Sequence, residues 1–424
     1  MKEIKIKGLN EIVYSTTLDN GLKVHMWQKE DVHSFYSTYM INYGSINTDF
    51  KIGKKEYHTP PGIAHYLEHI KFNINPDLTA HEMFAELGCE TNAFTSFNVT
   101  NYQVIGNKDA IDNTLRLLDF VQNPYFTKKL VNKERGIIVS EANLIYDNPF
   151  ALGMYGIFNN LFKRKECTKF ITGTSEDVKK ITLEDVTNVF NTYYHPQNCS
   201  LVITGNFNPY EMLAAIKENQ SNKEFGKYLN PIRIKSSESK KVIKEYEEVE
   251  ANVNNYKIRV AIKLRVDDYK DLTMLKVLLY TRIIININFG MCSDLRNELI
   301  DKELVHDINC GINELDRIII FQIYADTDYK EETLQRIYNQ LDNMILDKKS
   351  FARTINANIA STVLDFEDIE IVNESIQNDL LYQEEITDNK KEILESITYE
   401  DVLSFMEKID FKNRTTFIMC PKNN

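Results

Sequence analysis

Residues 58–72 read HTPPGIAHYLEHIKF, and the five residues HYLEH inside this stretch decide what kind of protein the chain is. On a helix, His65 and His69 lie one turn apart on the same face, so two imidazoles can converge on one small cation. Glu68 projects beside them. This spacing predicts a metal site with a carboxylate next to it.

The helix is expected to begin just before the histidines, with Thr59 as N-cap and Pro60 as first helical residue. The chain has 8 histidines among 424 residues. An H-x-x-E-H string therefore arises by chance in on the order of one such chain in a hundred. Histidine pairs at this spacing also occur on ordinary solvated helix faces, which stays the alternative for the string alone.

A third metal ligand must come from another part of the chain, because a catalytic zinc site has three protein ligands and one open position for water. Residues 130–149, LVNKERGIIVSEANLIYDNP, predict a helix that ends before Pro149. Glu134 and Glu141 lie two turns apart on nearly the same face of it. Glu141 can reach the metal while Glu134 orients a ligand, and a solvated acidic face is the alternative for this pair.

With these two segments the sequence resembles the M16 (pitrilysin and insulinase-like) metallopeptidases, and most of all their single-subunit bacterial branch. The inverted zinc motif H-x-x-E-H of that family stands at residues 65–69. Its distal pattern, an E-x6-E that begins with E-R and is followed by a D-x-P turn, resembles residues 134–141 and 147–149. The resemblance implies one Zn²⁺ per chain, with Glu141 as third ligand.

A third segment resembles the substrate-binding strand of the same family. Residues 88–95, GCETNAFT, match the pattern G-x-x-x-N-A-[FY]-T. In the family the backbone of this strand pairs with an extended peptide beside the metal, using main-chain hydrogen bonds that ignore side-chain identity. The implied substrate-binding residues are Asn92, Ala93, Phe94 and Thr95. Taken alone, the segment predicts only an ordinary edge strand.

The chain contains the same unit twice. Residues 107–120 resemble residues 326–339, and residues 181–207 resemble residues 397–422 at nearly the same offset. Each copy of the first pair predicts a strand end entering an amphipathic helix, and each copy of the second predicts a threonine-capped helix followed by an apolar strand. Two homologous mixed domains of about 200 residues follow from this repeat.

The predicted fold class is α+β, with two tandem homologous α/β-sandwich domains that form a clam-shell-like half. Each domain is expected to hold a mixed sheet with helices on one face. The best linker lies in the polar stretch 219–244. We therefore predict a catalytic zinc-binding domain at residues 1–229 and a homologous domain without metal ligands at residues 230–424.

Composition excludes some classes of function and leaves others open. The net charge of −12 is dispersed along the chain, which argues against nucleic-acid binding through a basic stripe. Six cysteines lie far apart without a CxxC pair, so we expect reduced thiols. The first residues, MKEIKIKGLN, lack the apolar core of a signal peptide, and no long apolar run predicts a membrane span. The expected location is the cytoplasm.

One family feature is not intact in this sequence. The second domain of the family usually carries an Arg and a Tyr in S-x-L-x-x-E-L-R-E-K-x-G-L-x-Y, where the Tyr stabilises the oxyanion. Residues 292–299 align with the start of this pattern, but Ile300 stands where the Arg is expected and His306 where the Tyr is expected, in a segment one residue shorter than the pattern. The expected partner is a related M16 subunit that supplies the Arg/Tyr pair in a heterodimer, or otherwise a second copy in a homodimer.

The resemblance implies a zinc metalloendopeptidase that hydrolyses short or unfolded peptides bound as an added β-strand. Glu68 is expected to act as general base toward a zinc-activated water, and Glu134 is predicted to be a second catalytic residue. Two alternatives remain. One is a non-catalytic structural or processing subunit of an M16 heterodimer, and the other is a dedicated leader-peptide protease for a modified peptide precursor.

Overall fold

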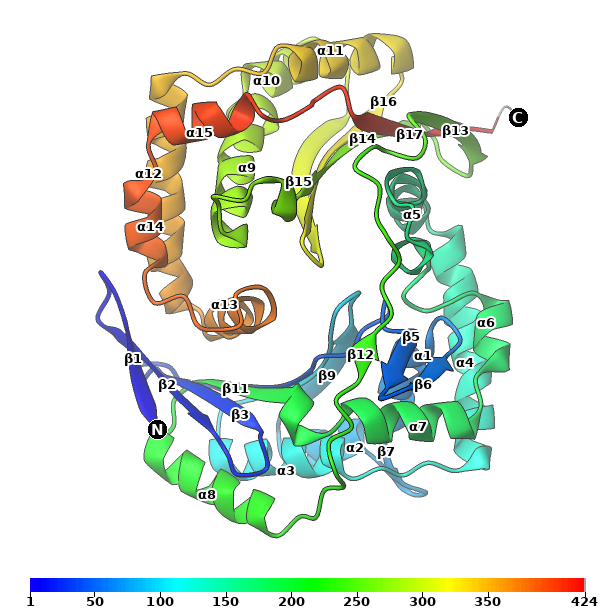
Figure 1. Ribbon diagram of the computed structural model, residues 1–424, viewed down its shortest axis with the longest axis vertical. Helices are drawn as coiled ribbons and strands as arrows, with labels where there is room; N and C mark the ends of the chain where they lie inside the picture. Colours follow the sequence, from blue (N-terminus) through cyan, green and yellow to red (C-terminus); the bar gives the residue numbers. More distant parts are fainter. Residues whose placement is uncertain (423–424) are drawn as a thin grey trace. The chain divides into compact units, whose positions relative to one another are not determined.

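The computed structural model describes residues 1–422, which form two compact units (Figure 1). Unit 1 contains residues 1–143, 169–235 and 363–390. Unit 2 contains residues 144–168, 236–362 and the described chain from 391 onward. Each unit thus draws segments from both halves of the sequence. The domain boundary predicted between 229 and 230 stays a prediction.

A seven-stranded mixed sheet forms the centre of unit 1, in the order β1-β2-β3-β11-β4-β10-β9. Only the β11–β3 pair is parallel within this sheet. The strand β9 therefore has a free edge. The strands are β1 (Lys2–Ile6), β2 (Glu11–Thr17), β3 (Lys23–Gln28), β4 (Phe35–Ile41), β9 (Glu90–Thr95), β10 (Thr100–Gly106) and β11 (Cys199–Gly205).

Small sheets and helices complete unit 1. A three-stranded sheet joins β5 (Asp49–Ile52), β6 (Lys55–His58) and β12 (Ile232–Arg233), and a two-stranded one joins β7 (Asn73–Asn75) and β8 (Leu78–Thr79). The helices are α1 (Ile63–Lys71), α2 (Ala80–Glu86), α3 (Ala110–Gln122), α4 (Lys128–Asp147), α6 (Ser175–Lys180), α7 (Leu183–Tyr193), α8 (Pro209–Ser221) and α13 (Ile369–Tyr382). The helix α4 continues beyond Asn143 into unit 2.

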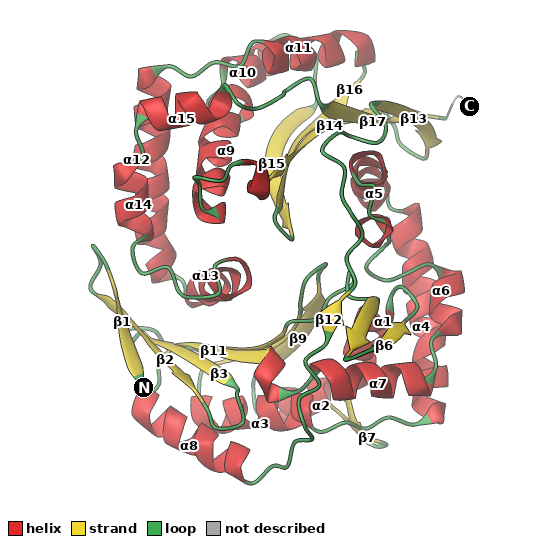
Figure 2. Ribbon diagram, in the orientation of Figure 1, coloured by secondary structure: helices red, strands yellow, loops and turns green. Residues whose placement is uncertain are grey.

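Both faces of the large sheet are covered by helices. Consecutive residues of a strand point to opposite faces, so Met26 and Trp27 of β3 belong to two different cores. Met26 lies in the larger core, which packs against α1, α3, α7 and α8. Trp27 lies in the smaller core, together with Val372 and Ile376 of α13. Figure 2 shows α13 and α3 on opposite sides of this sheet.

Unit 2 repeats the topology of unit 1. Its sheet has the order β13-β17-β14-β16-β15, which corresponds to β3-β11-β4-β10-β9, and its β17–β13 pair is likewise parallel. The strands are β13 (Tyr246–Ala251), β14 (Tyr256–Arg265), β15 (Asp307–Leu315), β16 (Ile318–Thr327) and β17 (Arg414–Pro421). The fold class of two homologous mixed α/β domains is confirmed.

The helices of unit 2 are α5 (Pro149–Leu161), α9 (Met274–Phe289), α10 (Asp294–Asp301), α11 (Lys330–Asp342), α12 (Lys348–Leu364), α14 (Lys390–Ser396) and α15 (Tyr399–Met406). The stretch Met274–Asp301 has the length and composition of a membrane span, but 61% of its most apolar window is buried inside the protein. Burial of this kind is the property of a core helix. The second predicted repeat is confirmed in detail, because Thr182 and Thr398 both form capping boxes, with Asp185 and Asp401.

The two halves of the sequence exchange one helix. The helix α5 follows α4 in the first half, yet it packs on β14 and β17 of unit 2. The helix α13 follows α12 in the second half, yet it packs on β4 and β11 of unit 1. Because β4 and β11 correspond to β14 and β17 in the repeat, the two helices occupy equivalent places. Sequence patterns did not predict this exchange.

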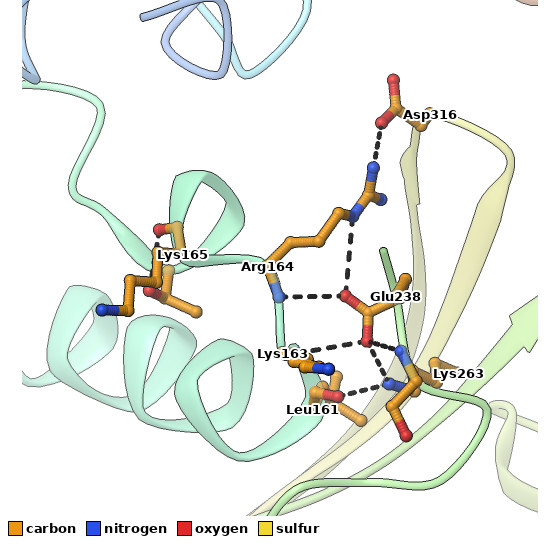
Figure 3. Close-up of polar contacts among 9 residues, drawn as sticks. Leu161, Lys163, Arg164, Lys165, Glu238, Lys263 and Asp316 are labelled. Carbon is orange, nitrogen blue, oxygen red and sulfur yellow. Dashed lines mark hydrogen bonds and ion pairs between the residues drawn. The ribbon is translucent and has the colours of Figure 1, made fainter. Parts of the chain in front are cut away.

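A buried ion network fixes the C-terminal end of α5 to the sheet of unit 2 (Figure 3). The Lys263 ammonium, whose side chain is 0% exposed, donates to Glu238 at 2.8 Å and also donates to the carbonyl of Leu161. Arg164 contacts Glu238 through Nε at 3.5 Å and pairs with Asp316 at 2.8 Å. The network holds the chain segment around Glu238 against both α5 and β14.

Candidate metal centre

The helix α1 carries the two histidines and begins later than the sequence predicts. It starts at Ile63, with Gly62 as N-cap at φ +90° and no side-chain cap. The predicted cap at Thr59 is therefore wrong, because the Thr59 hydroxyl donates to the Thr48 carbonyl instead. A Cβ on Gly62 would lie 2.3 Å from the Thr172 carbonyl oxygen. Only glycine fits this conformation and this close approach.

One face of α1 packs into the hydrophobic core, and the neighbouring face carries the two histidines of the candidate metal centre. Tyr66, Leu67 and Ile70 are fully buried in the larger core, so the helix cannot rotate without exposing them. His65 and His69 emerge together on the neighbouring face, with ring centroids 4.5 Å apart. His65 is 8% exposed. The core thus determines the direction in which both imidazoles point.

The third group comes from α4. Its buried residues Val131, Ile138 and Ala142 recur at helical spacing and face the core. The Tyr66 hydroxyl of α1 donates to the Val131 carbonyl, which ties the two helices together. Glu141 comes between Ile138 and Ala142 in the sequence and lies near the same side of α4. The packing of α4 against α1 therefore aims the Glu141 carboxylate at the histidine pair.

The three predicted ligands converge on one point. Glu141 Oε1 lies 3.5 Å from His65 Nε2, and Glu141 Oε2 lies 3.3 Å from His69 Nε2. One donor atom from each residue falls within 4.8 Å of the others. Glu141 keeps 36% of its side chain exposed, so solvent reaches the centre from one side.

Charge complementarity within this trio is strong. Hydrogen bonds from His65 and then His69 hold the pKa of Glu141 well below its usual range. Burial lowers the pKa of His69, but the hydrogen bond and charge of Glu141 outweigh burial and leave the pKa of His69 raised. A metal ion would use the Glu141 oxygens that accept these hydrogen bonds and would replace the protons on the two Nε2 atoms.

The donor set fits a catalytic zinc ion. Two imidazole nitrogens and one carboxylate are a known protein ligand set for zinc that leaves a fourth position for water or substrate. The Nδ1 atom of His65 is buried and has no hydrogen-bond partner within residues 1–422. His65 thus lacks the partner that usually fixes the tautomer of a metal-binding histidine.

Glu68 lies beside the trio and is itself held in place. Its side chain is 7% exposed, and the Thr95 hydroxyl at the end of β9 donates to its Oε2 at 2.6 Å. The sequence assigned Thr95 to substrate binding and gave no sign of this bond, because the two residues are 27 positions apart. The bond joins the predicted base to the predicted substrate strand.

The remaining predicted site residues lie on the edge strand β9 and on α4. Asn92 and Phe94 are exposed on β9, Ala93 is half-buried between them, and β10 pairs with only one side of the strand. Glu134 is 6% exposed and contacts Lys133 at 3.8 Å. Its charge contributes to raising the pKa of His69, but the described residues show no hydrogen bond from it to either histidine. Its orienting role stays a prediction.

Comparison with known proteins places this site in a family context. Residues 44–175 match the family described as insulinase (peptidase family M16), and residues 180–358 match the peptidase M16 inactive domain. The uncharacterised zinc protease YmfH of Bacillus subtilis is 33% identical over 309 residues, which cover 72% of each chain. The putative zinc protease AlbF of Bacillus subtilis is 27% identical over 201 residues, or 46% of each chain.

Solved structures agree on the fold. The crystal structure of a putative M16-like peptidase from Alicyclobacillus acidocaldarius superposes with a TM-score of 0.91 at 23% sequence identity. The match covers 98% of this chain and 100% of the other. The fold of this chain is therefore the one found in that protein.

Proposed function

The chain belongs to the M16 (insulinase) family of peptidases, and from that premise we propose that it is a zinc metalloendopeptidase acting on short or unfolded peptides. The observation that carries the proposal is the convergence of His65, His69 and Glu141, with Glu68 buried beside them. Relatives with the same family assignment are named zinc proteases.

The chain supplies binding, orientation and proton transfer. Zinc held by the three ligands would lower the pKa of a bound water toward about 7 and polarise a carbonyl. Glu68 would act as general base toward that water and then as general acid toward the leaving amine. The Thr95 hydroxyl donates a hydrogen bond to Glu68 Oε2 at 2.6 Å. Oε1 is therefore the carboxylate oxygen that would accept the proton of the water.

Substrate orientation falls to the free edge of β9. A peptide that adds to this edge forms main-chain hydrogen bonds with residues 92–95 and so takes up a fixed register. Because Thr95 ends β9 and also holds Glu68, that register is tied directly to the position of the base. Side chains of the peptide point away from the backbone contacts, so many sequences should be accepted.

The test separates metal binding from hydrolysis. Elemental analysis of the purified chain should find one zinc, and a quenched mixed peptide library should report cleavage once a related M16 subunit is added. Glu68→Gln should keep the zinc and lose hydrolysis, roughly a hundred-fold or more, whereas His65→Ala should lose both. Thr95→Val is the finer variant: it should keep zinc and lower kcat more than KM. Zinc-free protein with unchanged cleavage would overturn the proposal.

A second subunit is part of the proposal, because the chain lacks one family feature. Ile300 stands at the expected Arg, and His306, which stands at the expected Tyr, pairs with Asp328 at 2.8 Å. Glu303 adopts φ +54° where the family pattern has Gly. We propose that a related M16 subunit supplies the Arg/Tyr pair in a heterodimer, with a homodimer as the alternative. Full activity of the monomeric chain would contradict both.

Two other readings remain as outcomes of the same assays. A non-catalytic structural subunit would bind no zinc, and a dedicated leader-peptide protease would cleave one precursor while ignoring the mixed library. The location in the cytoplasm is likewise a proposal, which cell fractionation with an antibody against the chain would test.

A further inference from the structure

Unit 2 contains a cavity that takes no part in the metal centre. It has a volume of about 480 Å³ and lies between the first turn of α5 and the sheet of that unit. The strands β14, β15 and β16 contribute neighbouring polar residues to its wall, in two rows that cross the sheet. The residues that matter are Phe150, Lys257, Arg259, Asp307, Asn309 and Tyr324.

Arg259 is the central group of this wall. It is only 5% exposed, and its guanidinium carbon lies 4.7 Å from the Phe150 ring centroid and 4.6 Å from the Tyr324 ring centroid. Its Nη2 donates to the Phe150 carbonyl at 3.2 Å. A guanidinium against two rings donates hydrogen bonds only in its own plane.

A glycine in α5 leaves space for Arg259 but lowers the stability of the helix. Gly153 lies inside the helix, where glycine is less favourable than alanine by about 1 kcal/mol. A Cβ at this position would lie 2.3 Å from Arg259 Nε. The helix therefore passes directly over the arginine because residue 153 has no side chain.

Arg259 forms no ion pair of its own among residues 1–422, and its buried Nη1 finds no hydrogen-bond acceptor there. Asp326, on the neighbouring strand, is engaged by Lys257 at 2.6 Å. Burial lowers the pKa of Arg259, and the charge of Asp326 opposes that lowering only in part. A buried, unpaired guanidinium donor is costly unless a ligand accepts from it.

The equivalent position in unit 1 is built differently. There α13 inserts Asn373, which is fully buried and donates to the carbonyls of Tyr36 and Val202 while accepting from the Thr38 hydroxyl. The helix–sheet contact is thus closed by its own polar groups. In unit 2 the corresponding contact leaves a cavity and a free donor, so this part of the repeat has diverged toward binding.

The charges of the wall select the ligand. Lys257 and Arg259 are offset by Asp307 and Asp326, so a doubly charged phosphate would meet two repelling carboxylates. A single carboxylate on Arg259 leaves those two acids free to accept from an amide or ammonium group. Phe150 and Met419 offer apolar surface for a side chain. A volume of this size suits one or two amino-acid residues.

We propose that this cavity is a binding site for an α-carboxylate, carried by a free amino acid or by the C-terminus of a short peptide, with the Arg259 guanidinium as its anchor. The site is independent of hydrolysis at the metal centre. It gives unit 2 a ligand-binding role of its own.

The test uses calorimetric titration of the full-length Glu68→Gln chain, which cannot consume the peptide. The probes are free leucine, N-acetyl-Ala-Leu and N-acetyl-Ala-Leu-amide. If the site holds a carboxylate, the amide should bind at least about ten-fold more weakly than the acid, because a charge-assisted hydrogen bond is lost. Free leucine that binds as tightly as the peptide acid identifies the amino acid as ligand, and weaker binding identifies the peptide terminus.

Variants assign the binding to this cavity. Arg259→Lys keeps the charge but loses the planar fork, so it should reduce acid binding to the level of the amide. Because Arg259 is buried, a second pair of variants avoids the core: exposed Asn309→Trp should block the cavity, and Asn309→Ala should leave it open. Equal binding of acid and amide, unchanged binding in Asn309→Trp, or no binding of any probe would overturn the proposal.

Discussion

Replacement of Glu238 should destabilise unit 2 by an amount that the ion network in Figure 3 predicts. Glu238→Gln removes the negative charge and keeps one acceptor oxygen, which can serve the backbone N–H of Lys163 or that of Arg164 but not both. Arg164 retains Asp316. The uncompensated charge is therefore that of Lys263, whose side chain is 0% exposed.

Breaking a buried ion pair by removing one partner typically costs about 3 to 5 kcal/mol. Because Glu238→Gln retains one of the two backbone hydrogen bonds, we expect a loss toward the lower value, about 3 kcal/mol at pH 7. Glu238→Ala, which also leaves the backbone donors without an acceptor, should reach the upper value. Lys244 pairs with Glu247 at the surface, so Glu247→Gln is the matched control and should change stability by under about 1 kcal/mol.

The effect should depend on pH in a defined direction. Burial lowers the pKa of Lys263, while its hydrogen bond to Glu238 opposes that lowering. Without Glu238 the pKa of Lys263 falls further below its unfolded value. The unfolded state then binds more protons than the folded state at neutral pH, so stability rises as the pH rises. Part of the loss at pH 7 should be recovered near pH 10.

Hydrogen exchange of β14 amides is the appropriate assay, because it reports the opening of unit 2 apart from that of unit 1. Peptides from β4 provide the internal reference. A loss of β14 protection under about 1 kcal/mol at pH 7, or a loss that grows as the pH is raised, would refute the assignment of Lys263 as a buried cation held by Glu238. The double variant Glu238→Leu/Lys263→Met removes both charges and should recover most of the stability.

Three other predictions follow from the structure. Removal of zinc by a chelator should lower the unfolding free energy of unit 1 by roughly 4 kcal/mol if the free zinc concentration was a thousand times the Kd. Trp27 fluorescence should then report a lower unfolding midpoint. The His65→Ala chain should show no change on addition of the chelator. Burial lowers the pKa of His25 to about 4, so stability should fall by up to about 3 kcal/mol from pH 7 to pH 4, and His25→Asn should flatten that part of the urea-unfolding profile. Gly62→Ala should lower the unfolding free energy by more than about 2 kcal/mol. Gly53 also has a positive φ but has open space where a Cβ would lie, so Gly53→Ala should cost only the backbone strain of about 1 kcal/mol. Equal losses of stability in thermal unfolding would contradict the steric argument for Gly62.

The three residues of the candidate metal centre could be predicted to lie together because most of their geometry is local. Helical spacing alone places His65 and His69 on one face, and the helix that carries Glu141 is visible in the sequence. The start of α1 was mispredicted, since Thr59 and Pro60 look like a helix start while the real cap, Gly62, is imposed by the distant Thr172 carbonyl. A prediction from neighbouring residues cannot detect a contact with a residue 110 positions away in the sequence.

The bond between Thr95 and Glu68 and the unpaired edge of Arg259 were beyond sequence reasoning for a related reason. Both depend on which strand lies beside which helix. A threonine at a strand end and an arginine in an apolar strand are common features that become informative only when a buried partner, or the lack of one, is known. The sequence motif therefore identified the chemistry, but the structure supplied the residues that position and extend it.

The exchange of α5 and α13 explains why a tandem repeat does not yield two independent domains. Each helix covers the second face of a sheet whose strands come mostly from the other half of the sequence. Without α13, the core residues Val13, Trp27 and Val202 of unit 1 would lose their apolar cover, and without α5, Lys263 would lose its Leu161 acceptor. A hydrophobic face that only the other half can bury makes the folding of each unit conditional on the whole chain. The metal centre depends on the same connection, because α4 presents Glu141 in unit 1 and then runs on toward α5 in unit 2.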